Sequence, residues 1–319
     1  MKFLRIILLI ALTGFSLPSL AHEDPDQSGY IQVDGGKLWY RMNGIEHLGI
    51  KPAIIVMHGG PGGTHRGLMP YVELADTYPV ILYDQLGNGK SAKLVDDIND
   101  QSTWTVEHFV KEISQIRAAL NLDEVIIAGH SWGGTLSAEY AVKNEKGLRA
   151  AIFGSPLIST PQWVADNREW ITMMPQEYQD AINKHEAAGT FSDPEYREAE
   201  SAFYARHMCP GECIDRGFRA DAKRGNRTMY QTMWGPSEFT ANGTLADYDI
   251  SPQLHTVEVP VLMICGEFDE AAPKSCKKFA DMVPDATNVV VPGAGHATLG
   301  QEKDMVIGTI REFLAEKVK

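Results

Sequence analysis

The stretch "VIIAGHSWGGTLSAEYA", from Val125 to Ala141, indicates most directly how this chain folds. The apolar residues at its start predict a buried strand, and the residues after the glycines follow a helical pattern. At the junction, Ser131 lies between Gly129 and Gly133 in a G-x-S-x-G pattern. Glycines there lack the Cβ atoms that would clash in a sharp turn from strand to helix. The pattern therefore predicts a nucleophile elbow that exposes the hydroxyl of Ser131 at the end of a sheet.

Short apolar runs bounded by Gly or Pro occur along the rest of the chain. They read "AIIVMHGG", "PVILYDQLG", "AAIFGSP", "PVLMICGEFD" and "NVVVPGAGH". Helical patterns lie between them, such as "TVEHFVKEISQIRAAL" from Thr105, and "GYIQVDGGKLWYRM" reads as an N-terminal hairpin. Alternating strands and helices predict an α/β fold with a mostly parallel, largely eight-stranded sheet covered by helices on both faces.

The alternation stops between about Ser155 and Ile250, where Trp, Tyr, Met and charged residues are frequent and no clear strand is seen. It resumes at "VPVLMICGEFD". We therefore expect residues 28–154 and 251–319 to build one core together. Residues 155–250 are expected to form an inserted, mainly helical cap.

A serine nucleophile needs a base and an acid that orients the base. On a sheet of this kind the expected chain order is Ser, then Asp or Glu, then His. Asp269 follows an apolar strand in "VLMICGEFDEAAP", with Glu267 as its rival, and His296 lies in the loop after the last strand. We prefer Asp269 because it lies further beyond the strand, where reach toward His296 is easier. The predicted catalytic residues are Ser131, Asp269 and His296.

The stretch "VMHGGPGGTHRG" follows another apolar strand and contains a glycine loop. Such a loop exposes backbone amides close to the expected site of the serine. We predict that the N–H groups of Gly60 and Trp132 form the oxyanion hole. This chemistry requires neither a cofactor nor a metal, and we expect none.

Nucleotides and nucleic acids are poor candidates as partners. "DQLGNGKS" resembles part of a phosphate-binding loop, but that motif needs glycine where this chain has Asp84. Without residues 1–21, which include Lys2 and Arg5, the chain keeps 27 basic and 42 acidic residues, a net charge of −15. Such a charge repels phosphate backbones.

Residues 1–21, "MKFLRIILLIALTGFSLPSLA", have the pattern of a secretory signal peptide. Lys2 and Arg5 precede an apolar run that is short for a membrane span, and small residues end at Ala21. We expect a mature protein that begins near His22, is periplasmic or secreted, and is not held in the membrane. An uncleaved anchor is the alternative.

Four cysteines follow, at positions 209, 213, 265 and 276. In an oxidising compartment cysteines tend to pair, and "CPGEC" places Cys209 and Cys213 close enough for a small disulfide loop. Cys265 lies in an apolar strand pattern and is compatible with a buried thiol. The pairing of the four stays open, and too few further ligands lie nearby for a zinc site.

These motifs together resemble the proline iminopeptidase family of serine aminopeptidases within the α/β-hydrolase fold. The resemblance rests on "HGGPGG" at 58–63, "DQLGNGKS" at 84–91, "GHSWGG" at 129–134, "GSPLISTPQW" from Gly154, "MWGPSEF" from Met233, "GEFDEAAP" and "GAGH". It covers nearly all of the mature chain but departs from the family's pattern around "CPGECIDRG". The resemblance implies release of an N-terminal residue, proline or another small or apolar one, from peptides or amides.

Such an enzyme must recognise a protonated amine, for which carboxylates are the natural partner. The resemblance assigns Glu238 in "GPSEF" to the amine, with Glu212 in "CPGEC" as a second acid. Trp234 and Tyr204 are candidate walls of the side-chain pocket. An esterase or amino-acid amidase on the same fold is the main alternative, and a non-catalytic binding protein the second. The oligomeric state stays open.

Overall fold

A computed structural model describes residues 24–97, 100–211 and 225–318. The predicted signal peptide, Glu212 and Cys213 lie outside these residues. The described chain forms one eight-stranded sheet in the order β1-β2-β4-β3-β5-β6-β7-β8. β1 pairs antiparallel with β2, as does β2 with β4, and all other neighbours pair parallel. The predicted fold, with its mostly parallel sheet and helical insertion, is confirmed.

Every apolar run named from the sequence contains a strand. The strands are β1 (Gln27–Val33), β2 (Gly36–Asn43), β3 (Ala53–Met57), β4 (Val80–Asp84), β5 (Val125–His130), β6 (Leu148–Gly154), β7 (Val261–Gly266) and β8 (Ala286–Val291). The predicted hairpin is also present, with Val33 opposite Gly36 across its turn.

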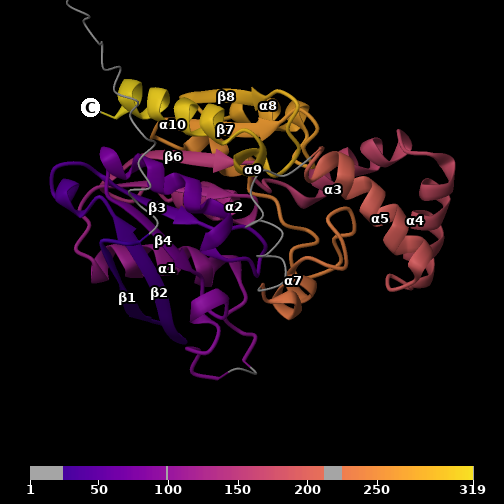
Figure 1. Cartoon of the computed structure of the whole chain (residues 1–319), viewed down its shortest axis with the longest axis horizontal. Helices are drawn as coiled ribbons and strands as arrows, with labels where there is room; N and C mark the ends of the chain where they lie inside the picture. Colours follow the sequence, from indigo (N-terminus) through magenta and orange to yellow (C-terminus); the bar gives the residue numbers. More distant parts are fainter. Residues whose placement is uncertain (1–23, 98–99, 212–224, 319) are drawn as a thin grey trace, which may run out of the picture.

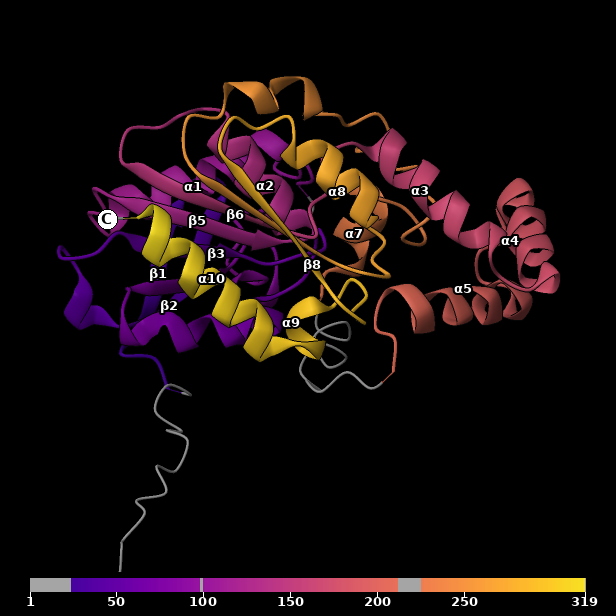
Figure 2. The same ribbon diagram turned by 90° about the horizontal axis from the view of Figure 1, so that it is seen from above.

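Successive side chains of the strands point to opposite faces, and each face carries its own core. In β3, Ile55 and Met57 belong to one buried cluster, and Ile54 and Val56 to the other. The first cluster is covered by α1 (Val106–Ala119), α2 (Trp132–Ala141) and α8 (Pro273–Ala280). The second is covered by the 3-10 segment η2 (His65–Asp76), α9 (Thr298–Gln301) and α10 (Lys303–Lys317). Figure 2 shows α10 lying across the sheet on the side away from α1 and α2.

The elements described between the two halves of the sheet are helices. They are α3 (Thr160–Thr172), α4 (Gln176–Ala188), α5 (Pro194–His207) and α7 (Arg227–Met233). α4 and α5 project from the sheet at one end of the molecule (Figure 1) and enclose a small core of their own, in which Tyr196, Phe203 and Phe239 are fully buried. The division of the chain at residues 155 and 250 stays a prediction.

The remaining elements are short 3-10 turns: η1 (Ile45–His47), η3 (Gly89–Ser91) and η4 (Ser251–Thr256). None of the helices within residues 24–97, 100–211 and 225–318 has the length and apolar character needed to cross a membrane. Cys209 is disulfide-bonded, whereas Cys265 and Cys276 are buried free thiols.

Candidate active site

Ser131 occupies the turn between β5 and α2. Its backbone has φ 56° and ψ −121°, a conformation that residues with a side chain rarely adopt. A Cβ atom on Gly129 would lie 2.0 Å from the carbonyl oxygen of Gly133, and one on Gly133 would lie 2.0 Å from that of Met57. Only glycine fits at either position, so the G-x-S-x-G pattern is a steric requirement of this turn.

The glycine loop after β3 runs directly beside the serine. A Cβ atom on Gly59 would come within 3.1 Å of the Ser131 Cβ, and Gly60 has φ 122°. Trp132 is the first residue of α2, so its N–H has no acceptor within the helix and remains available to a substrate oxygen. Gly60 and Trp132 therefore border the serine from two elements, and their role as oxyanion donors stays a prediction.

Gln85 joins these two elements. Its side-chain NH₂ group donates to the carbonyl oxygen of His58 (3.0 Å), its backbone N–H donates to His58 Nε2 (3.1 Å), and its Oε1 accepts from the indole N–H of Trp132 (2.9 Å). Trp132 is buried and also packs edge-on against Phe109, so its ring stabilises the core and does not wall a pocket.

Asp84, the first residue of the "DQLGNGKS" motif, holds two loops together. Its buried carboxylate accepts hydrogen bonds from the backbone N–H groups of His65 and Lys90 and contacts His65 Nδ1 at 2.8 Å. Burial alone would raise the pKa of Asp84, but the hydrogen bond and charge of His65 outweigh burial and lower it. The motif thus stabilises the loops around the site and is not a phosphate-binding loop.

His296 and Asp269 form a buried pair in which His296 Nδ1 lies 2.7 Å from Asp269 Oδ1. Asp269 also accepts from Ala271 N–H on Oδ1, and from the Ser155 hydroxyl and Gly266 N–H on Oδ2. Burial opposes ionisation of both groups. The charge of His296 and these hydrogen bonds nevertheless hold the pKa of Asp269 below its usual value, and Asp269 and Glu238 raise the pKa of His296.

Glu267, the rival acid, is exposed and accepts a hydrogen bond from Gly293 N–H at 2.9 Å. The structure therefore brings Asp269 to His296 and leaves Glu267 at the surface. Sequence reasoning missed Ser155, a fully buried residue with φ 43° whose hydroxyl lies 2.6 Å from Asp269. No local pattern around Ser155 indicates this contact.

Two rings pack against His296. The ring centroid of His130 lies 4.7 Å away and that of Trp163 lies 5.6 Å away, edge-on. Burial, together with the charge of His296, lowers the pKa of His130 to about 3, so His130 is neutral. A neutral ring thus packs beside His296 without adding a competing charge.

Glu238 faces the same space from the cap side. Its Oε1 accepts a hydrogen bond from the Tyr230 hydroxyl at 2.7 Å, and its backbone N–H donates to the Tyr204 hydroxyl at 3.1 Å. Burial raises the pKa of Glu238, although the charge of His296 and the Tyr230 hydrogen bond partly offset that effect. The structure therefore places the predicted amine-binding acid beside the predicted base.

A second carboxyl group, Glu270, was missed by sequence reasoning. It is completely buried, and neither of its carboxyl oxygens has a hydrogen-bond partner among the described residues. Burial, followed by the charges of Glu238 and Asp269, holds the pKa of Glu270 well above its usual range. A buried carboxyl group of this kind is a candidate functional residue. The sequence signal that could have identified Glu270 was its position directly after Asp269 in "GEFDEAAP".

Ser131, His296, Glu238 and the glycine loop line a cavity of about 300 Å³. Trp234 and Tyr204 are not among the described residues that line it. Trp234 donates its indole N–H to Ser237 and packs edge-on against Trp163, and the Tyr204 hydroxyl donates to Glu200 at 3.3 Å. Their assignment to the pocket, like that of Glu212, stays a prediction.

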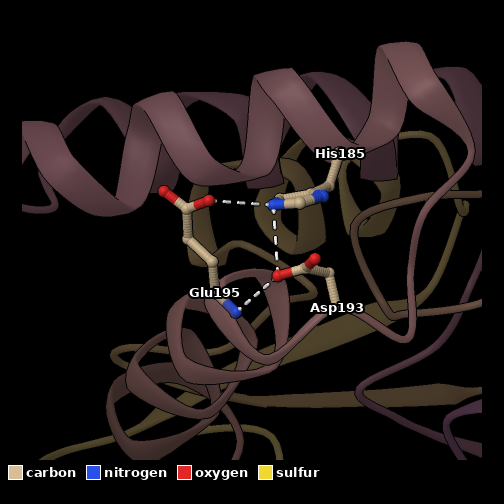
Figure 3. A group of neighbouring side chains, drawn as sticks. All are labelled: His185, Asp193 and Glu195. Carbon is tan, nitrogen blue, oxygen red and sulfur yellow. Dashed lines mark hydrogen bonds and ion pairs between the residues drawn. The ribbon is translucent and has the colours of Figure 1, made fainter.

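One group within the described residues offers three metal-ligand types, but it lies in the cap (Figure 3). His185 Nε2 is 3.1 Å from Glu195 and 3.6 Å from Asp193. Lys184 Nζ lies 2.5 Å from the same Glu195 oxygen, and Asp193 caps α5 by accepting from Glu195 N–H. These contacts account for the group without a cation, and it contributes nothing to the serine site.

Comparison with known proteins identifies close relatives. The chain matches the α/β-hydrolase-fold family over residues 52–303. It is 37% identical over 294 residues to the proline iminopeptidase of Heyndrickxia coagulans, covering 90% of this chain and 98% of that protein. The crystal structure of the proline iminopeptidase of Mycobacterium smegmatis is similar with a TM-score of 0.82 at 33% identity, covering 91% and 98% of the two chains. The crystal structure of VinJ is similar with a TM-score of 0.85 at 33% identity, covering 92% and 100%.

Proposed function

The chain belongs to the proline iminopeptidase family of α/β hydrolases, and from this premise we propose that it is a serine aminopeptidase that releases an N-terminal residue from peptides or amides. Proline is the expected residue, with other small or apolar residues as further substrates. The observation that carries the proposal is the position of Glu238, which lines the same cavity as Ser131 and His296.

The proposed chemistry proceeds through an acyl-enzyme. The Ser131 oxygen attacks the carbonyl carbon of the first residue while His296 takes the serine proton, and Asp269 stabilises the resulting imidazolium. The N–H groups of Gly60 and Trp132 bind the negatively charged oxygen. His296 then gives its proton to the leaving amine as the carbon–nitrogen bond breaks. A water molecule, deprotonated by His296, releases the free amino acid and restores Ser131.

The two carboxyl groups favour substrates with a free amine. Burial holds the pKa of both carboxyl groups above the usual value, and the charge of Glu238 adds to this effect at Glu270. An incoming ammonium group favours the ionised form. A pair of unit charges 4 Å apart interacts by about 4 kcal/mol at an effective dielectric of 20. An ester or an acylated amine gains nothing from this arrangement.

Glu238→Gln is expected to lower kcat/KM for free-amine substrates by about 2–4 kcal/mol, or roughly 30- to 1,000-fold. The change keeps the side-chain shape and removes the charge. Neutral esters should be nearly unaffected at the plateau of the pH profile. Because Glu238 raises the pKa of His296, its loss should move the acidic limb of the ester profile to lower pH. Kinetics on proline aryl amide, its N-acetyl derivative and a short ester test these statements.

Glu270→Gln should act in the same direction on free-amine substrates. Glu198→Gln is the matched control. Glu198 is exposed on α5, and its substitution removes the same charge from the cap. If Glu238→Gln slows esters and free-amine amides equally, Glu238 is a structural residue and an esterase becomes the better assignment.

We further propose that the protein is exported and cleaved after Ala21. The signal-like pattern of residues 1–21 supports this proposal, and so does the disulfide of Cys209, because disulfides persist mainly in oxidising compartments. N-terminal sequencing of native protein should find a chain that begins near His22 in the periplasm or the medium. Native protein that retains Met1 would contradict cleavage.

A further inference from the structure

Helix α7, Arg227–Met233, contributes two side chains to the cavity wall. Arg227 and Tyr230 are one helical turn apart, and both line the cavity that contains Ser131. Tyr230 donates its hydroxyl hydrogen to Glu238, so this part of the helix supports the amine-binding acid. In both views of the molecule α7 lies between the sheet and the projecting helices α4 and α5 (Figures 1 and 2).

Arg227 is the only residue with a permanent positive charge among the described residues that line the cavity. It is exposed, and no described residue forms an ion pair or a side-chain hydrogen bond with it. It also lies in the first turn of its helix, where the helix dipole disfavours a cation. Neither an ion pair with a described residue nor the stability of α7 therefore accounts for an arginine at this position.

The backbone that carries Arg227 is fixed to the catalytic loops. Asn226 donates its backbone N–H to the Gly62 carbonyl at 2.7 Å and its side-chain amide to the Gly87 carbonyl at 3.1 Å. Asn226 Oδ1 also caps α7 by accepting from Met229 N–H. The position of Arg227 is thus defined relative to the glycine loop that contains Gly60.

The size of the cavity suits a very short peptide. Two extended residues span at most about 7 Å. A cavity of about 300 Å³ is at the small end of ligand sites. The lining includes one carboxyl group, that of Glu238, and one guanidinium group, that of Arg227, which match the two charges of a dipeptide.

Resting on the proposed aminopeptidase function, we infer that Arg227 binds the free carboxylate of the residue after the scissile bond and makes dipeptides the preferred substrate class. The guanidinium group presents paired N–H donors that match a carboxylate. In this arrangement Glu238 binds the ammonium, Ser131 faces the single peptide bond, and Arg227 binds the C-terminal carboxylate.

The test compares prolyl-alanine with prolyl-alanine amide, which differ only in the terminal carboxylate, and uses proline aryl amide as a reference. The native enzyme should favour the free acid by about tenfold in kcat/KM. Arg227→Gln should bring that ratio close to one and reduce hydrolysis of prolyl-alanine far more than that of the aryl amide, whereas Arg227→Lys should keep part of the preference. Raising the salt concentration should reduce the native ratio, because Arg227 is exposed.

Arg149→Gln is the matched control, since Arg149 pairs with Glu124 at the surface and does not line the cavity. The role of Arg227 is overturned if the native enzyme hydrolyses prolyl-alanine and its amide with equal kcat/KM, or if Arg227→Gln does not change the ratio of the two values. In either case, hydrolysis of the aryl amide would still support the proposed aminopeptidase function. A native enzyme that does not hydrolyse the aryl amide would instead overturn the proposed function itself.

Discussion

Ser131→Ala is expected to reduce kcat on proline aryl amide by about a millionfold, the scale seen when the nucleophile of a serine hydrolase is removed. The remaining groups cannot replace the serine oxygen, because Asp269 and His296 act only through it. Substrate binding should survive, since Glu238 and the glycine loop are unchanged. A fluorophosphonate probe, which reacts with an activated serine, should label the native protein and fail to label the variant.

The backbone of the elbow should tolerate this change. Alanine keeps the Cβ atom that serine already carries at φ 56°, and the close contacts of Gly129 and Gly133 remain. Ser201→Ala is a suitable control, because Ser201 is exposed on α5 and, among the described residues, its hydroxyl bonds only to the Arg197 carbonyl. A Ser131→Ala enzyme with more than about one percent of native activity would show that another nucleophile operates.

The sheet could be predicted because its strands are buried on both faces. Such strands read as continuous apolar runs, and in β3 and β5 every residue is buried. The elbow could be predicted for a second reason. A Cβ atom at position 129 would meet the carbonyl oxygen of Gly133, only four residues further along, so this requirement appears as a short local pattern.

The carboxyl pair could not be predicted in full, because long-range packing assembles it. Glu238 comes from the inserted segment and Glu270 from the loop after β7, and only the folded chain brings them together. Sequence reasoning identified Glu238 by resemblance and named Glu212 as a second acid. Glu212 lies outside the described residues and stays a prediction, whereas Glu270, whose charge interacts with that of Glu238, was not named. Composition also does not fix the direction of a side chain, so the assignment of Trp234, whose indole donates to Ser237, to the pocket stays a prediction.

Asp269→Asn is expected to reduce kcat by about 10⁴-fold, less than Ser131→Ala but still severely. The carboxylate accepts from His296 and Ala271 on one oxygen and from Ser155 and Gly266 on the other. Asparagine offers one acceptor oxygen and one NH₂ group. Each oxygen of Asp269 accepts a hydrogen bond from a backbone N–H, Oδ1 from Ala271 and Oδ2 from Gly266. Whichever way the asparagine amide is turned, its NH₂ group therefore faces one of these two donors. The substitution therefore cannot reproduce the native contacts.

Two further measurements separate the catalytic effect from this loss of hydrogen bonds. A buried donor left without an acceptor costs about 1–3 kcal/mol, which a thermal or denaturant melt should detect. The kinetic signature is a change in pH dependence. Asp269 raises the pKa of His296, so removing its charge lowers that pKa. The neutral, active form of His296 then persists to lower pH, and the acidic limb of the kcat/KM profile should move in that direction.

Glu267→Gln is the matched control for this substitution. Glu267 lies two residues before Asp269, carries the same charge and bonds to Gly293 N–H at the surface. It has no contact with His296 through which its charge could fix the tautomer of the imidazole, so Glu267→Gln should keep both native turnover and the native acidic limb. If Glu267→Gln instead causes the severe loss and Asp269→Asn is mild, the acid of the catalytic set is Glu267. The buried Asp269 would then be a residue that only supports the loop after β7.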